Sequence, residues 1–345
     1  MVGKEVLAVS GLARQFTAPV AITDRLFGKK PTVTRAVDGV DLVLHKGETL
    51  GLVGESGCGK STLARCLVGL YPLTAGTISY DGVPLSARRT REQQRALQMV
   101  FQDPYSSLNP RMTVEQTLSE LLRFHNLVPR AKVGERCREL MHLVGLPERA
   151  LGQRPRQFSG GQRQRVGIAR ALAVEPKVLI ADEPVSALDV SVQATIINLL
   201  TDLRHTLDLS VIFVSHNMAV VRQISDRTAV MYRGRIVETG NTETLFDDPV
   251  HPYTKLLLGS VPRLLDPAGP SGAPGAPGGT ESTTRTEVMM SAATAGTRPC
   301  RFLDRCPSVV AGCAAEPALL PDPRDPARLS ACVHLAAREL VEGQA

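Results

Sequence analysis

Glycines, a lysine and a hydroxyl group occur together in one short segment, in a spacing that can hold phosphate groups. The segment Gly54–Ser61 reads Gly-Glu-Ser-Gly-Cys-Gly-Lys-Ser, which fits the pattern G-x-x-x-x-G-K-[ST]. In such a loop, the glycines let backbone N–H groups curl around phosphate oxygens, the lysine contacts the terminal phosphates and the hydroxyl reaches Mg²⁺. The sequence therefore predicts a phosphate loop made of Gly54, Glu55, Ser56, Gly57, Cys58, Gly59, Lys60 and Ser61, followed by Thr62.

Two adjacent carboxylates follow an apolar run that is typical of a buried strand. The segment Val178–Glu183 reads Val-Leu-Ile-Ala-Asp-Glu. At the carboxyl end of such a strand, Asp182 can hold Mg²⁺ through water, while Glu183 points to where an attacking water would sit. Glu183 is therefore the candidate general base, and Asp182 joins Ser61 as a candidate magnesium residue.

A serine and two glycines open a helix in the segment Phe158–Gln162, which reads Phe-Ser-Gly-Gly-Gln. We expect this helix to run to about Val174, and Ser159 with Gln162 fits a capping box at its start. Two adjacent glycines are unusual for a cap alone, because they cost backbone entropy while leaving N–H groups bare for an anion. The segment therefore indicates an anion contact at Ser159, Gly160, Gly161 and Gln162.

These residues need a scaffold that brings strand ends and helix starts together. Short β-branched runs alternate with helical stretches up to about residue 240, which predicts an α/β domain with a largely parallel sheet. Within it, we expect Thr49–Val53 to be a buried strand that feeds the phosphate loop, and a helix to start at about Lys60. This order of strand, loop and helix is the context that the phosphate pattern requires. At 345 residues, the chain is long enough for one large domain and a smaller one.

The composition limits the classes of protein to which the chain can belong. Its formal net charge is +6, but basic and acidic residues alternate without a long block, which is typical of a solvated surface. The chain contains no run of about 18 apolar residues, and Met1–Glu5 lacks the apolar core of a signal peptide. We therefore expect a cytosolic chain whose seven cysteines are not paired in structural disulfides.

The order of these motifs resembles the nucleotide-binding subunit of ABC transporters over residues 1 to about 260. A phosphate loop is followed by Phe158–Gln162 and then by Ile180–Glu183, which reads Ile-Ala-Asp-Glu. The resemblance implies a P-loop ATPase of the ABC type with a helical subdomain at about 103–175. It implies that two such domains close head to tail, so that ATP held by one contacts Ser159–Gln162 of the other. The implied cofactors are ATP and Mg²⁺, and the positions that match the family's catalytic residues fit a competent ATPase.

Further site residues are implied by the same resemblance. Gln102 resembles the glutamine that senses Mg²⁺ and the membrane partner. His216, after the strand Val211–Val214, resembles the histidine that contacts the γ-phosphate and orients water. Phe16, with Val37, is expected to stack on adenine. A loop that resembles the D-loop of the family consists of Ser186, Ala187, Leu188 and Asp189.

Two proline-containing segments resemble one branch of the family, the importers of dipeptides, oligopeptides and nickel. The first, Gln102–Arg111, precedes a helix that Thr113 and Gln116 could cap. The second, Asp248–Leu257, resembles the C-terminal extension of that branch. The branch implies an ATPase at the cytoplasmic face of the membrane that powers peptide import through two separate transmembrane permease subunits. The other implied partners are a second, paralogous ATPase subunit in a heterodimer and, indirectly, an extracytoplasmic substrate-binding protein.

Two alternative functions remain open. The first is an ATPase of the same branch that serves an importer of nickel or another small solute. The second is a soluble ABC ATPase that acts on nucleic acid or ribosomes. The sequence has neither the long coiled-coil insertion nor the second ATPase cassette of such proteins, so no nucleic acid is expected as a partner.

The composition changes beyond the predicted ATPase domain. Residues 261–298 are rich in Pro, Gly, Ser, Thr and Ala, which predicts a flexible linker. Residues 299–345 form a small extension that holds four of the seven cysteines, namely Cys300, Cys306, Cys313 and Cys332.

The spacing of these four cysteines bears on a metal role. Their gaps of five, six and eighteen residues are wider than the gaps of about two to four residues within zinc-ligand pairs. Relatives in the peptide-importer branch have a similarly spaced set that can hold an iron–sulfur cluster, so we hypothesise a [4Fe-4S] site. The alternative is four unligated side chains that act as small apolar residues. Cys58, Cys66 and Cys137 are scattered, and no metal role is assigned to them.

Overall fold

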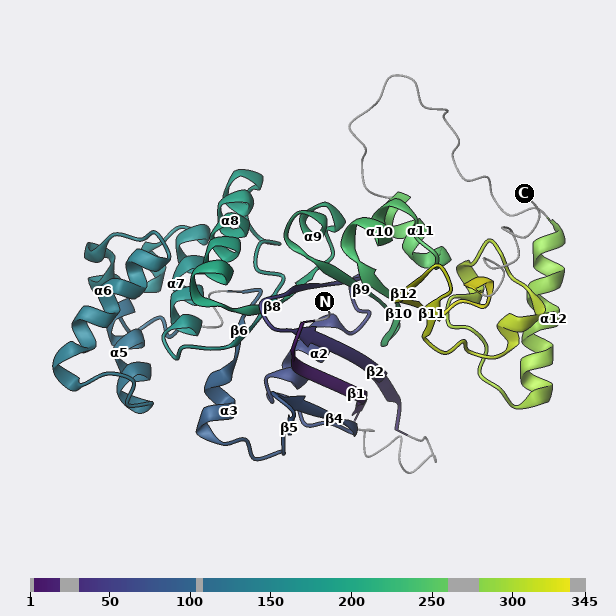
Figure 1. Cartoon of the computed structure of the whole chain (residues 1–345), viewed down its shortest axis with the longest axis horizontal. Helices are drawn as coiled ribbons and strands as arrows, with labels where there is room; N and C mark the ends of the chain where they lie inside the picture. Colours follow the sequence, from purple (N-terminus) through teal and green to yellow (C-terminus); the bar gives the residue numbers. More distant parts are fainter. Residues whose placement is uncertain (1–2, 19–30, 104–107, 260–278, 336–345) are drawn as a thin grey trace, which may run out of the picture.

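A central mixed sheet organises the chain (Figure 1). The computed structural model describes residues 3–18, 31–103, 108–259 and 279–335. Within this part, the sheet has eight strands in the order β11, β12, β10, β9, β3, β8, β7, β6. The strands from β9 to β6 pair in parallel, and β10, β12 and β11 continue the sheet in antiparallel pairs. In chain order, these strands are β3 (Thr49–Val53), β6 (Leu97–Val100), β7 (Val178–Asp182), β8 (Ser210–Ser215), β9 (Arg227–Tyr232), β10 (Arg235–Asn241), β11 (Leu320–Asp322) and β12 (Asp325–Ser330).

A second sheet and a set of helices cover the two faces of the central sheet. The second sheet is antiparallel and has the order β2, β1, β4, β5. Helix α2 contacts strands of both sheets, and α8, α9 and α10 lie on the opposite side of the central sheet (Figure 1). The strands of the second sheet are β1 (Glu5–Thr17), β2 (Val33–His45), β4 (Ala75–Tyr80) and β5 (Val83–Pro84), and the helices named here are α2 (Lys60–Leu67), α8 (Val190–Leu207), α9 (Met218–Ile224) and α10 (Thr242–Asp247).

Alternate residues of the central strands belong to two different hydrophobic clusters. In β7, Val178 and Ile180 pack with the second sheet and α2, whereas Leu179 and Ala181 pack with the helices on the other face. Every residue of β3, β7 and β8 is buried, as is typical of parallel strands that are covered on both faces. The predicted α/β fold with a largely parallel sheet is therefore confirmed.

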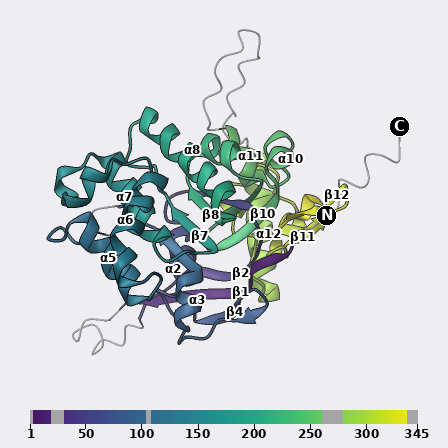
Figure 2. The ribbon, with the colours of Figure 1, turned by 60° about the vertical axis from the view of Figure 1, so that its left-hand side comes forward.

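Helices α5, α6 and α7 form the part of the chain in which the helical subdomain is expected (Figures 1 and 2). Both predicted capping boxes are present. Thr113 caps α5 with Gln116, and Ser159 caps α7 with Gln162. Residues 104–107 of the segment Gln102–Arg111 lie outside the described residues. The bounds here are α3 (Arg91–Ala96), α5 (Val114–Phe124), η1 (Arg130–Lys132), α6 (Val133–Leu143), η2 (Glu148–Gly152), η3 (Pro155–Gln157) and α7 (Gly160–Leu172).

The C-terminal extension joins the central sheet. Strand β12 pairs with β10, so the extension prolongs the sheet at the end opposite to α5, α6 and α7 (Figures 1 and 2). The structure differs from the expected linker over residues 279–298, because Gly279–Ala295 form helix α12, while residues 260–278 lie outside the described part. Val288 of α12 packs against Leu303 and Cys313, which gives this helix a buried face. The remaining bounds are α11 (Pro252–Gly259), η4 (Leu303–Arg305) and η5 (Ala311–Ala314).

A buried ion pair connects the extension to β10. Arg328 of β12 donates to the carboxylate of Glu238, with Nε at 3.1 Å from Oε1, and the two side chains are 3% and 0% exposed. The same carboxylate accepts the backbone N–H groups of Val250 and His251, both at 2.9 Å. Glu238 thus holds together β10, β12 and the start of α11.

Replacing Arg328 by alanine is expected to lower the free energy of unfolding by about 3 to 5 kcal/mol, because it leaves the Glu238 carboxylate buried without a counter-charge. Urea denaturation of the full chain measures this effect. Arg149→Ala, at an exposed position of η2, is the control and is expected to stay within about 0.5 kcal/mol of the parent protein. Equal stability of the two variants would contradict a structural role for the pair.

Candidate active site

The phosphate loop lies between β3 and α2, as the sequence predicts. Gly54, Gly57 and Gly59 have φ values of 151°, 81° and 112°, a region that favours glycine. A Cβ atom on Gly54 would lie 2.1 Å from the Met231 carbonyl oxygen, and one on Gly59 would lie 2.1 Å from the Ala36 carbonyl oxygen. Glycine is therefore required at both positions, because the loop lies directly against β9 and β2.

Lys60 and Ser61 are the first residues of α2; Lys60 contacts the residues that follow β3, and Ser61 contacts the last residue of β7. Lys60 is 4% exposed, and its Nζ donates to the carbonyl oxygens of Gly54 at 2.7 Å and Glu55 at 3.0 Å. Ser61 Oγ donates to Asp182 Oδ1 at 2.9 Å. Burial raises the pKa of Asp182, although the hydrogen bond from Ser61 acts in the opposite direction. A hydroxyl and a buried carboxylate side by side form the oxygen-rich donor set that Mg²⁺ prefers.

Glu183 accepts two contacts on a single carboxylate oxygen. Gln102 Nε2 donates to Glu183 Oε2 at 3.1 Å, and His216 Nδ1 lies 3.2 Å from the same oxygen. Gln102, Glu183 and His216 follow β6, β7 and β8, which are neighbours in the parallel sheet. Because parallel strands end at the same edge, the fold brings these three side chains together. Glu183 also has φ of 46°, which is uncommon for a residue other than glycine.

The segment Ser159–Gln162 packs against the predicted D-loop of the same chain. A Cβ atom on Gly160 would lie 3.2 Å from Leu188 Cδ2, and one on Gly161 would lie 2.4 Å from Val192 Cγ1. Ser186 Oγ donates to the Glu183 carbonyl oxygen at 3.1 Å. The D-loop of Ser186, Ala187, Leu188 and Asp189 therefore connects Glu183 to the start of α7.

The two residues expected to stack on adenine have different environments. Phe16 is half-buried, meets the Tyr71 ring edge-on at 5.5 Å between centroids and lies under the guanidinium of Arg14 at 4.6 Å. Val37 is fully buried in the cluster between the two sheets. The structure therefore leaves Phe16 available for stacking but not Val37, because the alternation of side chains along β2 turns Val37 into the core.

Two contacts to the phosphate loop come from residues that the sequence patterns did not single out. The backbone N–H of Glu55 donates to Tyr253 Oη at 2.8 Å. Arg305 forms an ion pair with the Glu55 carboxylate. Tyr253 lies in the segment Asp248–Leu257, and the resemblance of this segment to the peptide-importer branch was the one sequence feature that pointed to it. No sequence feature pointed to the role of Arg305, because its partner Glu55 is 250 residues away along the chain.

His251, which precedes Tyr253, is buried and accepts the Tyr253 backbone N–H through Nδ1 at 3.0 Å. Burial lowers its pKa to about 4 from a usual value of 6.5. The folded state therefore keeps this imidazole neutral, and stability is lost as the pH falls from 6.5 towards 4, because the unfolded chain takes up the proton first.

We expect the free energy of unfolding to fall by about 2 kcal/mol between pH 7 and pH 5 through this group alone. The measurement is chemical denaturation at both pH values. His251→Asn keeps an acceptor for the Tyr253 N–H but does not titrate, so its stability should decrease less over this range. The same decrease in the parent chain and in the variant would argue against His251 as the cause.

The four cysteines of the extension do not form a metal site in the described residues, where no group of three or more His, Cys, Asp or Glu side chains is arranged to hold a metal ion. Burial raises the pKa of both Cys300 and Cys332 to about 11. Both side chains are therefore thiols at neutral pH in the metal-free protein. The described residues therefore do not support the hypothesised [4Fe-4S] cluster.

Two family models match the chain. Residues 37–186 match the model described as ABC transporter. Residues 237–313 match the model described as oligopeptide/dipeptide transporter, C-terminal region. In the part of the chain that the structure describes, no helix is long and apolar enough to cross a membrane.

Similar proteins agree with these matches. The oligopeptide transport ATP-binding protein OppF of Salmonella typhimurium is 50% identical over 240 residues, which cover 68% of this chain and 72% of that protein. The oligopeptide transport ATP-binding protein AppF of Bacillus subtilis is 50% identical over 245 residues, which cover 70% of this chain and 74% of that protein.

Solved structures show the same fold. The structure of cbiO1 from Clostridium perfringens, part of the ABC transporter complex cbiONQ, has a TM-score of 0.59 and 28% identity and covers 71% of this chain and 92% of that one. The structure of the ATP-binding cassette MJ0796, a dimer in a post-hydrolysis state bound to ADP and Pi, has a TM-score of 0.59 and 26% identity. The match covers 68% of this chain and 98% of that one. The chain therefore belongs to the ABC transporter ATPases, in the family of oligopeptide transport ATP-binding proteins.

Proposed function

We propose that this chain binds and hydrolyses ATP and thereby powers the import of dipeptides or oligopeptides through two separate transmembrane permease subunits. The observation that carries this proposal is the convergence of Ser61, Asp182, Gln102 and His216 on the space around Glu183, beside the phosphate loop. The names of the relatives at about 50% identity support peptides as the cargo.

In the proposed binding step, the backbone N–H groups of the phosphate loop hold the phosphates of ATP. Lys60 Nζ, which now donates to two loop carbonyls, turns to the terminal phosphates. Phe16 stacks on the adenine. Ser61, Asp182 and Gln102 would hold Mg²⁺, which would neutralise charge on the phosphates. The raised pKa of Asp182 supports this set, since a buried carboxylate of this kind gains from a nearby cation.

In the proposed hydrolysis step, Glu183 accepts a proton from the attacking water. His216 and Gln102 contact the same carboxylate oxygen and orient it. His216 would also contact the γ-phosphate. General-base catalysis of this kind contributes about 10² to 10⁴ in rate.

The active form that we propose is a head-to-tail dimer with a paralogous ATPase subunit, at the cytoplasmic face of the membrane. Ser159 and Gln162 are exposed, which leaves the start of α7 accessible to a partner. In this dimer, Ser159, Gly160, Gly161 and Gln162 contact the γ-phosphate held by the other subunit. The dimeric cassette bound to ADP and Pi supports the arrangement by analogy. An extracytoplasmic binding protein would deliver the cargo to the permease.

We further propose that residues 1–260 form the nucleotide-binding domain and residues 299–345 a C-terminal extension docked on it. The pairing of β12 with β10 supports a fixed position for this extension. No iron–sulfur cluster is included in the proposed function, because no arrangement of the described residues supports one.

The test is uptake of labelled dipeptide, longer peptide and nickel ion in cells that carry the parent chain or Glu183→Gln. Loss of peptide uptake in the variant is the expected result. Loss of nickel uptake alone would identify nickel, rather than peptides, as the cargo. Unchanged uptake of all three would reject the proposal and favour an ATPase that acts away from the membrane.

A further inference from the structure

Residues 300–306, which we name the docking segment, reach from the extension to the phosphate loop. The Arg305 guanidinium forms a two-pronged contact with the Glu55 carboxylate, with Nη1 to Oε2 and Nη2 to Oε1 both at 2.8 Å. This contact lowers the pKa of Glu55, chiefly through the hydrogen bonds from Arg305. The paired geometry fixes the position of Glu55 as well as its charge.

The peptide group of Glu55 is held from a second direction by aromatic side chains. Its N–H donates to Tyr253 Oη at 2.8 Å. Tyr253 is fully buried and lies 5.5 Å from the Phe302 ring of the docking segment, between ring centroids. The carbonyl oxygen of the same Glu55 accepts Lys60 Nζ at 3.0 Å. Glu55 therefore connects the docking segment to the lysine of the phosphate loop.

Arg301 anchors the other end of the docking segment on the turn behind the loop. Its guanidinium contacts the carboxylates of Asp38 and Glu316 and the carbonyl oxygen of Arg233. Gly234, which follows Arg233 in this turn, donates its N–H to the Cys58 carbonyl oxygen at 2.8 Å. The docking segment thus contacts both the front of the phosphate loop and the turn that supports it.

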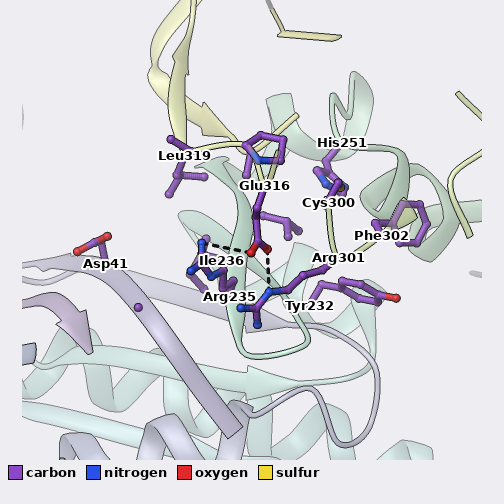
Figure 3. A pocket seen from close by; sticks show the side chains of 15 residues that line it. Asp41, Tyr232, Arg235, Ile236, His251, Cys300, Arg301, Phe302, Glu316 and Leu319 are labelled. Atoms are coloured by element: carbon purple, nitrogen blue, oxygen red, sulfur yellow. Dashed lines mark ion pairs between the residues drawn. The ribbon is translucent and has the colours of Figure 1, made fainter. Parts of the chain in front are cut away.

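A cavity of about 290 Å³ separates part of the docking segment from β10 (Figure 3). Figure 3 shows Arg301 directed at Glu316, with His251 beside Cys300. Beside this cavity, the segment is held by the ion pairs of Arg301, Asp304 and Arg305 and by the buried side chains of Phe302, Leu303 and Cys306.

The phosphate loop needs such support because three of its residues are glycines with positive φ. Glycine-rich backbone loses more conformational freedom when it is fixed than any other backbone. A contact that fixes the loop before ATP arrives lowers the entropic cost of binding.

We propose that the C-terminal extension positions the phosphate loop for ATP, and that Arg305 is the positioning residue, acting through Glu55. This inference rests on the proposed ATP site. Arg305 has no contact with Glu183, Gln102 or His216 among those found in the described residues. Its loss should therefore weaken ATP binding without slowing the hydrolysis of bound ATP.

The experiment compares Arg305→Gln, Glu55→Gln and the double variant in the full chain, with Arg149→Gln, at an exposed position of η2, as a charge-matched control. Binding of a fluorescent ATP analogue and the KM and kcat for ATP are measured for each. Arg305→Gln should weaken binding and raise KM by about threefold to tenfold, with kcat within about twofold. In the Glu55→Gln background, Arg305→Gln should have no further effect, because its partner is already neutral.

Three results would overturn the proposed positioning role of Arg305. It fails if Arg305→Gln binds ATP as tightly as Arg149→Gln, if its effect persists in the Glu55→Gln background, or if kcat falls while KM stays constant. Arg305→Lys keeps the charge and should recover part of the affinity, which checks the effect if Arg305→Gln folds poorly. Lys60→Ala distinguishes the two proposals. If Lys60→Ala loses ATP binding while Arg305→Gln binds ATP like the parent chain, only the positioning role is rejected. If Lys60→Ala still binds ATP tightly, the proposed ATP site itself is rejected.

Discussion

Replacing Glu183 by glutamine is expected to lower the rate of ATP hydrolysis by about 10²-fold to 10⁴-fold while ATP binding is retained. The carboxylate receives Gln102 and His216 on Oε2. Among the described residues no contact to Oε1 is found, so this oxygen can take the proton of the attacking water. Glutamine has the same shape and can still accept through its carbonyl oxygen. It cannot take up a proton at neutral pH, so the variant loses the base and keeps the geometry.

Phosphate release at saturating ATP measures this effect, and binding of a fluorescent ATP analogue measures retention of the site. Glu175→Gln is the matched control, because Glu175 also has a positive φ, of 55°, but is exposed. The control should hydrolyse ATP like the parent chain. A Glu183→Gln rate within a few-fold of this control would remove Glu183 from the role of general base.

Replacing Lys60 by alanine is expected to weaken ATP binding by about 10-fold to 100-fold, because each hydrogen bond from a charged group contributes about 1.5 to 3 kcal/mol. The Lys60 side chain is buried at the concave side of the loop, where its ammonium donates to the Gly54 and Glu55 carbonyls. Alanine removes the positive charge and leaves these carbonyls without their donor. The loop would therefore lose both its attraction for phosphate and part of its shape.

Binding of the fluorescent analogue, followed by competition with ATP and ADP, measures the loss. Lys177→Ala removes an exposed lysine and should bind like the parent chain. Thermal unfolding of Lys60→Ala checks that the domain is folded. A folded Lys60→Ala protein with unchanged affinity would mean that phosphates bind elsewhere.

Local patterns predicted the site because its parts are local. The phosphate loop, the strand Thr49–Val53 before it and the capping boxes at Thr113 and Ser159 each depend on residues within a few positions of one another. The order of the motifs then placed Gln102 and His216, although they lie far apart along the chain. Their meeting at Glu183 follows from the order of β6, β7 and β8 in one parallel sheet.

Contacts of high sequence separation could not be predicted in this way. No pattern connects Arg305 with Glu55, or Arg328 with Glu238, because each pair depends on where the extension docks. Composition also predicted a linker through residue 298, but α12 is helical where Val288 finds Leu303 and Cys313. Val37 was assigned to adenine by position in the family, whereas the pleat of β2 buries it.

The most direct test of the central claim, that the residues around Glu183 form an ATP hydrolysis site, is the identity of the nucleotide retained by the purified protein. The parent chain and Glu183→Gln are each incubated with ATP and Mg²⁺, washed and analysed for bound nucleotide. We expect ATP in the variant and ADP in the parent chain. ADP in both proteins would show that hydrolysis proceeds without Glu183 and would exclude this residue as the general base.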